Sequence, residues 1–131
     1  MAHIEINIHP VYTDYGADLD GNIYSFKFGK IRLIKDSHHG RGYRQFRMSF
    51  SRNEGKMYLV HRFVYECWTG EMIDPDLQCN HFDHDKTNNA FANLDLMTDA
   101  QNREHREAAG RPTGGAAHKK YLQKNLQYEM D

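Results

Sequence analysis

Hydrophobic and polar positions follow two different periods along the chain, and the period changes near residue 60. Over residues 17–60, short runs alternate between apolar and polar side chains, and Asp20-Gly21 is typical of a hairpin turn. From residue 60 onward, apolar positions recur at intervals of three and four, which indicates one buried helix face. That face comprises Val60, Phe63, Val64, Cys67 and Trp68. Because Gly70 is a typical helix stop, the pattern predicts an antiparallel sheet over 17–60 and a helix over Val60–Thr69.

Two further strands and a helix are predicted between residues 77 and 108. Residues 77–81 and 94–97 are short, largely apolar runs separated by a polar loop. Thr98 and Gln101 form a capping-box pair at the start of a helix that ends before Gly110. Together these elements make a ββα unit. A last helix is predicted over Ala116–Tyr128, so the expected fold class is α+β: a basic antiparallel sheet, the ββα unit and a C-terminal helix.

Length and composition fit a single domain. The 131 residues divide into the sheet (17–60), the helix plus ββα unit (60–108) and a basic C-terminal helix or tail (109–131). A mean hydropathy of −0.86 predicts a modest core. The two cysteines are too few for a disulfide framework, and neither a signal-peptide pattern nor a membrane-length apolar run is visible. These features predict an intracellular, cytoplasmic protein with no membrane partner.

The net charge of −1 conceals a polarised distribution. Residues 27–62 carry ten Lys/Arg against two Asp/Glu, a local charge of +8, whereas residues 63–107 carry three against ten, a local −7. Basic segments bind phosphates and acidic ones can surround a cation, but chance clustering on solvated faces explains the same distribution. The candidates for DNA contact are Arg41, Arg44, Arg47, Arg52, Lys119 and Lys120. For the arginines, ordinary solvated surface is an equal alternative.

The segment from Cys79 to Asn102 concentrates the side chains that phosphodiester hydrolysis requires. Water must lose a proton to a base, and histidine suits this role because its pKa lies near neutrality. Growing negative charge must meet a cation, and Mg²⁺ takes oxygen ligands from amides and carboxylates. Asn80 and His81 stand at the expected end of a strand, and Asn102 stands in the first turn of the expected helix. The spacing therefore favours a metal-dependent hydrolase.

This segment resembles the HNH endonuclease family, also called ββα-metal nucleases, in its phage- and intron-encoded homing branch. The resemblance implies that Asn80 and Asn102 bind the metal and that His81 is the general base. It also implies that Asn93 braces the loop and helps to orient the base. The resemblance to the family also rests on Asn93-Leu94, Met97-Thr98, Gln101-Asn102 and the helix start Val60-His61-Arg62-Phe63-Val64.

The resemblance implies a nuclease that cuts double-stranded DNA with a divalent metal, Mg²⁺ first and Mn²⁺ second, and holds no structural zinc. One site per chain cuts one strand, so a double-strand break needs a homodimer or two events. Many relatives carry aspartate where this chain has Asn80, and a neutral amide brings the metal no charge. This departure keeps open an alternative, a DNA-binding protein that retained the fold and lost the chemistry.

The other histidines of the segment have competing interpretations. His84 could join Cys79 and His81 in a zinc site, but a fourth ligand is missing. His105 could contact the phosphate or the metal, and a solvent-exposed position is about equally expected. His61 is expected on the helix side away from the apolar face, as a structural residue hydrogen-bonded beneath the site.

Overall fold

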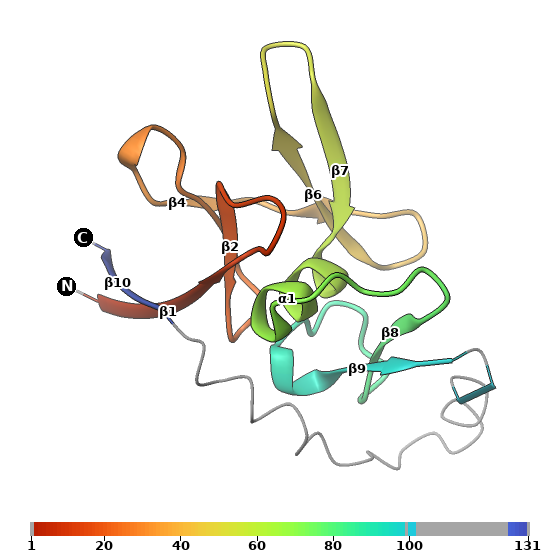
Figure 1. Cartoon of the computed structure of the whole chain (residues 1–131). Coiled ribbons are helices and arrows are strands. Elements are labelled where there is room, and N and C mark those ends of the chain that lie inside the picture. Colours follow the sequence, from red (N-terminus) through yellow and green to blue (C-terminus); the bar gives the residue numbers. More distant parts are fainter. Residues whose placement is uncertain (1, 99, 102–125, 131) are drawn as a thin grey trace.

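The computed structural model describes residues 2–98, 100–101 and 126–130. Strands surround one central helix, and the hairpin of β6 and β7 projects away from it (Figure 1). The elements are β1 (Ala2–Ile8), β2 (Tyr15–Asp18), β3 (Ile23–Ser25), η1 (Lys27–Gly29), β4 (Arg32–Ile34), β5 (Ser37–His38), β6 (Arg44–Ser49), β7 (Gly55–Leu59), α1 (Val60–Thr69), β8 (Gln78–His81), η2 (Phe91–Asn93), β9 (Leu94–Met97) and β10 (Leu126–Met130). No described helix has the length and hydrophobicity to cross a membrane.

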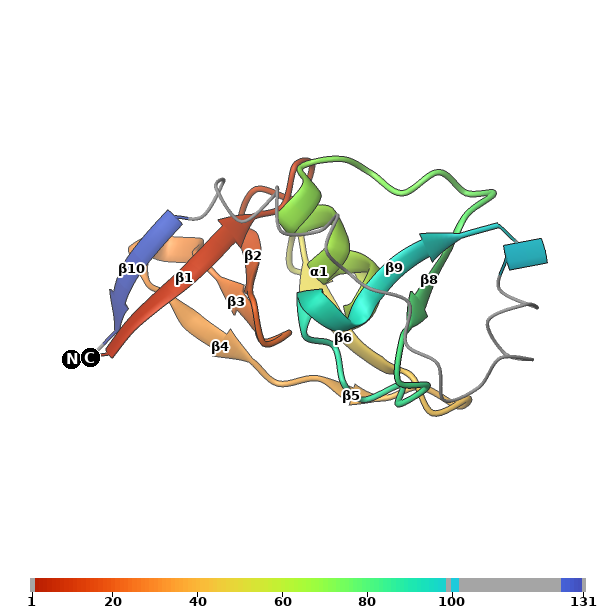
Figure 2. The same cartoon turned by 90° about the horizontal axis from the view of Figure 1, so that it is seen from below.

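The described strands form three antiparallel sheets: the meander predicted over 17–60 is divided between the first two, and the third is the predicted pair of strands of the ββα unit. The first has five strands in the order β10-β1-β2-β3-β4, the second has the order β5-β6-β7, and the third pairs β8 with β9. The first sheet begins at Ala2, so the predicted start at residue 17 was wrong. The predicted Asp-Gly hairpin is confirmed, because β2 and β3 pair through a turn in which Gly21 has a φ of 94°. Figure 2 shows the β8–β9 hairpin and the first sheet at different sides of α1.

The C-terminal end of the chain is a strand, not the predicted helix. Strand β10 pairs with β1 in the register Ala2↔Met130 to Ile6↔Leu126. The helix predicted over Ala116–Tyr128 was therefore wrong over residues 126–128. Its remaining residues, with Lys119 and Lys120, lie outside the described part of the chain, as do Asn102 and His105.

Helix α1 is the centre of the core and has the predicted bounds. Its five apolar-face residues are all buried, and Trp68 Nε1 donates to the Asp18 carbonyl at 3.1 Å. Gly70 ends the helix in the left-handed region, with φ at 74° and its N–H bonded to Glu66 O. His61, on the side away from the apolar face, is also buried, at 5% exposure, which fits the structural role expected for it. Strand β8 covers that side, and Cys79 Sγ lies 3.6 Å from the His61 carbonyl oxygen.

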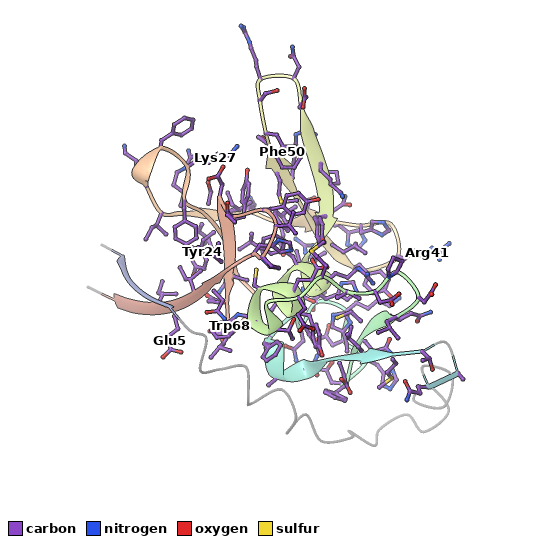
Figure 3. All side chains as sticks on the ribbon, in the orientation of Figure 1. Glu5, Tyr24, Lys27, Arg41, Phe50 and Trp68 are labelled. Carbon is purple, nitrogen blue, oxygen red and sulfur yellow. The ribbon has the colours of Figure 1, made fainter. Side chains whose placement is uncertain are left out.

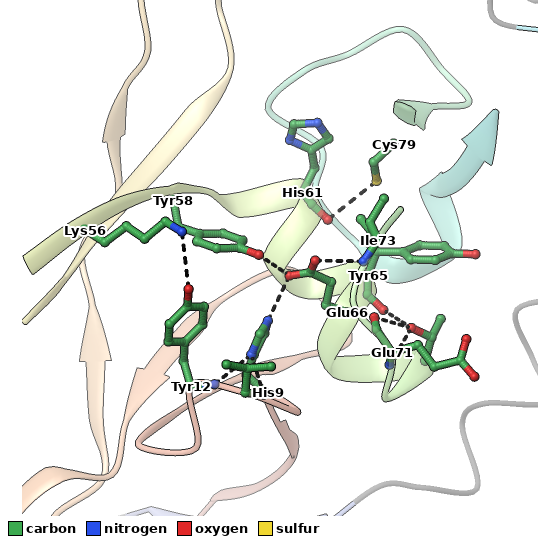
Figure 4. Close-up of polar contacts among 12 residues, drawn as sticks. His9, Tyr12, Lys56, Tyr58, His61, Tyr65, Glu66, Glu71, Ile73 and Cys79 are labelled. Atoms are coloured by element: carbon green, nitrogen blue, oxygen red, sulfur yellow. Dashed lines mark hydrogen bonds and ion pairs between the residues drawn. The ribbon is translucent and has the colours of Figure 1, made fainter. Parts of the chain in front are cut away.

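A buried carboxylate fixes α1 to the surrounding strands (Figure 4). Glu66 accepts hydrogen bonds from His9 Nε2 at 2.8 Å, from the Ile73 N–H at 3.0 Å and from the Tyr58 hydroxyl. His9 Nδ1 accepts the backbone N–H groups of residues 11 and 12, so the ring proton that Glu66 receives is on Nε2. Burial raises the pKa of Glu66, but these donors outweigh it and hold the pKa below its ordinary value. The carboxylate therefore joins the β1–β2 loop, β7 and the segment after α1.

Candidate active site

The β8–β9 hairpin presents its two key side chains on opposite faces. Strand β8 ends at His81, as the sequence predicted, and Asn80 pairs with Asp95 while His81 pairs with Leu94. Because side chains alternate along a strand, Cys79 and His81 face α1 and are buried, whereas Asn80 faces the other side and is half-buried. At the end of β8, the imidazole of His81 therefore lies on one face of the hairpin and the neutral amide of Asn80 on the other.

The contacts of the His81 ring within the described part of the chain include three side chains. Its Nε2 lies 2.8 Å from Asn89 Oδ1, and both residues are buried. The His61 ring is 4.9 Å away between centroids, and the Tyr43 ring is 6.2 Å away. Tyr43 also stacks on His61 at 5.1 Å with an interplanar angle of 14°. The imidazole of His81 thus sits against two rings and one amide.

Burial keeps both histidines unprotonated near neutral pH. It lowers the pKa of His81, against the opposing effects of Asn89, Asp83 and Asp85. Burial and the neighbouring His81 and Arg62 lower the pKa of His61 to about 3. A neutral imidazole can accept a proton, so His81 has the protonation state that a general base needs.

Asn93 fastens the loop that follows β8. Its Oδ1 accepts the Asp83 N–H at 3.2 Å, and its Nδ2 donates to Asp83 Oδ1 and to the Asn88 carbonyl, both at 2.9 Å. Asp83 also accepts from Asn88 Nδ2 at 2.7 Å. These donors outweigh the effect of desolvation and lower the Asp83 pKa. The contacts fit the bracing role expected for Asn93.

The sequence did not identify the residue that meets the His81 ring. Asn88 and Asn89 are adjacent, and the sequence indicates only that both can shape a loop. The one available signal was the position of Asn89 just before the apolar pair Ala90-Phe91, where the chain returns to the core.

Side-chain oxygens that could bind a metal lie on the face of the hairpin opposite His81. Asn80 Nδ2 donates to Met97 Sδ at 2.9 Å, so the amide oxygen is the atom that could coordinate a cation. Asp95 is the direct cross-strand neighbour of Asn80, so a carboxylate lies on the same face. Within the described residues, no three His, Cys, Asp or Glu side chains cluster to hold a metal ion. The Asn80 amide oxygen and the Asp95 carboxylate are ligands of the type that a hard cation such as Mg²⁺ prefers. Two such ligands do not complete a coordination shell, so further oxygens are needed.

The predicted DNA-contact arginines fall in two places. Arg41 and Arg44 lie near the candidate site, where Lys86 Nζ donates to the Arg41 carbonyl at 3.0 Å. The Arg44 guanidinium bonds Asp36 Oδ1 at 2.9 Å. In Figure 3, Arg41 lies at the right edge of the molecule, apart from Lys27 and Phe50.

Arg47 and Arg52 line a groove of about 380 Å³ beside the projecting hairpin. Lys27 and Arg32 line it too, and none of the described residues lining it is acidic. Lys27 Nζ donates to the Ser49 carbonyl and lies 5.5 Å from the centre of the Tyr15 ring. The exposed rings of Phe28 and Phe50 complete the rim. The groove is therefore cationic and partly aromatic.

The hairpin continues into a capped helix start. The Thr98 N–H donates to Gln101 Oε1 at 3.0 Å, and the Gln101 N–H donates to Thr98 Oγ1 at 3.2 Å, so the predicted capping box is confirmed. Ala100 and Gln101 are helical. A strand that ends in histidine, a braced loop, a second strand and a capped helix start define a site of the ββα class.

Comparisons with known proteins agree with this class. Residues 58–104 match the family model described as HNH endonuclease. An uncharacterized HNH endonuclease of Acanthamoeba polyphaga mimivirus is 38% identical over 60 residues, which cover 46% of this chain and 32% of that protein. The chain thus spans about a third of the length of this relative. The structure of the HNH homing endonuclease I-HmuI, solved to describe DNA binding and cleavage, matches with a TM-score of 0.64 and 25% identity, covering 98% of this chain and 78% of that chain. The matched segment and the shared fold both support assignment of the chain to the HNH endonuclease family.

Proposed function

We propose that the chain is a metal-dependent DNA endonuclease that hydrolyses a phosphodiester bond. The observation that supports this most is the buried, unprotonated imidazole of His81, held 2.8 Å from Asn89 at the end of β8. A base in this state, on a hairpin inside the matched segment 58–104, suits the activation of water.

The proposed reaction assigns each side chain one role. His81 takes the proton of a water whose oxygen attacks phosphorus, and the bond from phosphorus to the 3′ oxygen breaks. The leaving 3′ oxygen takes a proton from solvent, so 5′-phosphate and 3′-hydroxyl ends remain. Asn80 and Asn102 would hold a divalent cation, Mg²⁺ or Mn²⁺, and Asp95 would add the negative charge that Asn80 lacks. The bound cation would neutralise charge on the phosphate and on the leaving oxygen. His105 is proposed to contact the phosphate, and His61 supports the His81 ring from behind.

Double-stranded DNA is the proposed substrate, and two basic surfaces would bind it. The groove of Arg47, Arg52, Lys27 and Arg32 offers four cations without a carboxylate among its described lining residues, which suits backbone phosphates. Arg41 and Arg44 would contact DNA nearer the scissile bond, and Lys119 and Lys120 would extend the contact.

One site in one chain supports nicking, and we propose that a double-strand break requires a homodimer or a second event. The cellular setting proposed for such an enzyme is the cytoplasm, and for a phage-encoded or homing nuclease the cytoplasm of the host.

A plasmid assay tests the proposal against its closest alternative. Supercoiled plasmid is incubated with the protein and Mg²⁺, Mn²⁺ or EDTA, and binding of the same DNA is followed by gel shift. The proposal predicts open-circular product with either metal, none with EDTA, and nicks that DNA ligase can seal because they carry 5′-phosphate. Binding without cutting in any divalent metal would instead identify a DNA-binding protein that lost the chemistry.

A further inference from the structure

His81 could serve as a base only through the ring nitrogen that carries no proton, so the residue that fixes its tautomer decides which nitrogen faces the water. We infer that Asn89 is this positioning residue: its amide oxygen holds the proton of His81 on Nε2 and leaves Nδ1 as the basic nitrogen. The inference deepens the proposed function and rests on it, and it moves the orienting role from Asn93 to Asn89.

The contact itself defines the tautomer. His81 Nε2 lies 2.8 Å from Asn89 Oδ1, and an amide oxygen can only accept a hydrogen bond. Nε2 must therefore carry the proton, and in a neutral imidazole the lone pair is then on Nδ1. Both residues are buried, at 6% and 5% exposure, so exchange of this bond with water is restricted.

Asn93 is occupied elsewhere. Both protons of its amide and its oxygen are used on the backbone and carboxylate of the loop, at Asp83 and Asn88. It shapes the loop that carries Asn89, and Asn89 makes the contact with the ring.

The backbone of Asn89 is held by a distant turn. Gly21, between β2 and β3, packs so closely that a Cβ there would stand 2.5 Å from the Asn89 carbonyl oxygen. Two residues along, the Phe91 N–H donates to the Leu19 carbonyl at 2.9 Å, and Phe91 is buried beside Trp68. The turn between β2 and β3 thus fixes the position of the Asn89 backbone relative to α1.

Two rings restrain His81 on its other sides. His61 lies 4.9 Å away between centroids, and Tyr43 spans both histidines. Lys86 Nζ lies 4.6 Å from the centre of the Tyr43 ring and also donates to the Arg41 carbonyl, which fastens the β5–β6 turn to the loop after β8. With one edge bonded and one face covered, the imidazole has a defined orientation.

The test reads the tautomer separately from the cutting. Two-bond ¹H–¹⁵N spectra of the metal-free protein, at about pH 8 where histidine is neutral, distinguish pyrrole-like from pyridine-like ring nitrogens. His81→Ala identifies the His81 signals by their loss. We expect Nε2–H in the wild type, a mixture or the reverse in Asn89→Ala, and Nε2–H in Asn89→Asp, which keeps an acceptor oxygen. Asn88→Ala, the matched neighbour, should keep the wild-type spectrum.

Single-turnover nicking of plasmid under saturating protein gives the second readout. Asn89→Ala should lower the rate about 100-fold through misorientation of the base, with the Kd for DNA within about twofold, and Asn89→Asp should restore most of the rate. A wild-type Nδ1–H tautomer would overturn the inference, and so would an Asn89→Ala protein with unchanged spectrum and rate. If Asn89→Ala does not fold, Asn89→Asp decides, since loss of both tautomer and rate there contradicts the inference. If the wild type cuts no DNA but the tautomers behave as expected, the nuclease proposal fails and the positioning contact stands.

Discussion

The most consequential single residues are two histidines held neutral side by side. His61 and His81 lie with ring centroids 4.9 Å apart, and burial lowers the pKa of each. If both were charged, two cations would face each other in a largely dehydrated space, so the fold itself favours the basic form of His81.

Acid should destabilise the protein through His61. Its pKa is about 3 in the folded protein and near the ordinary 6.5 when unfolded, so the unfolded chain binds the extra proton between these values. This contribution to stability is full above about pH 6.5 and falls by up to roughly 1.4 kcal/mol per pH unit as the pH drops towards 3. Urea unfolding of the wild type and His61→Phe from neutral to acidic pH measures it. The variant should lose less stability than the wild type, and parallel pH dependence in the two proteins would contradict the assignment.

Charge at the proposed metal face should set the metal requirement. Asn80→Asp adds a carboxylate where an amide oxygen stands, and Asp95→Asn removes the carboxylate paired with it across the hairpin. Because ligand charge strengthens the binding of hard cations, we expect about tenfold tighter Mg²⁺ binding for the first and about tenfold weaker for the second. Calorimetric titration of Mg²⁺ into each protein provides the measurement. Equal affinities in all three proteins would place the metal away from this face.

At the level of elements, the turn between β2 and β3 does more than reverse the chain. Gly21 has a φ of 94° and abuts Asn89, whereas Gly29 has a φ of 69° and nothing within 4 Å of its Cβ position. A side chain at Gly21 would therefore clash with the Asn89 backbone, whereas a side chain at Gly29 would extend into open space.

Alanine at these two glycines should separate backbone strain from the contact. Gly29→Ala should cost about 1–2 kcal/mol for a left-handed alanine. Gly21→Ala carries the same strain and also a clash with the Asn89 backbone, so a further cost of about 1–3 kcal/mol is expected. Denaturant midpoints measure both. Equal losses would show that the Gly21–Asn89 approach relaxes freely.

Elements with a strong local period could be predicted from the sequence. Helix α1 and strand β9 have the predicted bounds, because the apolar residues of α1 recur at helical spacing and β9 is a short, largely apolar run. Strand β10 was missed although Leu-Gln-Tyr-Glu-Met alternates between apolar and polar residues, because the run is short and its partner β1 lies at the other end of the chain. Strand pairing over such a separation depends on tertiary contacts and leaves little local signal.

In the candidate site too, some features follow from the local sequence and others depend on tertiary contacts. The histidine at the end of β8 and the capping box follow from local pattern, and both are present. The Asn89–His81 contact depends on the conformation of the intervening loop and on Gly21 from another sheet. The burial of His61 depends on β8 crossing over α1, which no helical period reveals.

Across the whole molecule, the basic groove and the candidate catalytic hairpin lie on different elements. Arg41 lies at one edge of the molecule, and Lys27 and Phe50, which line the groove, lie apart from it (Figure 3). A bound duplex would therefore contact the protein at two separated places, with phosphate contacts in the groove contributing affinity more than chemistry.

Arg47→Ala combined with Arg52→Ala should weaken DNA binding and flatten its salt dependence. Each lost phosphate contact should reduce the slope of log K against log salt by about 0.9. Arg44→Ala is the comparison variant: it removes a single proposed contact whose guanidinium is already paired with Asp36, so the slope should change less. Fluorescence anisotropy with a labelled duplex over a range of salt measures the slopes. If Arg44→Ala changes the slope as much as the double variant, the groove is not the main phosphate contact.

The central claim is that His81 activates water for phosphodiester hydrolysis with a divalent metal. The most direct measurement is the Mg²⁺-dependent nicking rate of supercoiled plasmid by the wild type and by His81→Ala, prepared in parallel and matched for folding and DNA binding. Loss of a general base predicts a rate about 10²–10⁴-fold lower in the variant, with DNA affinity retained. Equal nicking by both proteins would contradict the account.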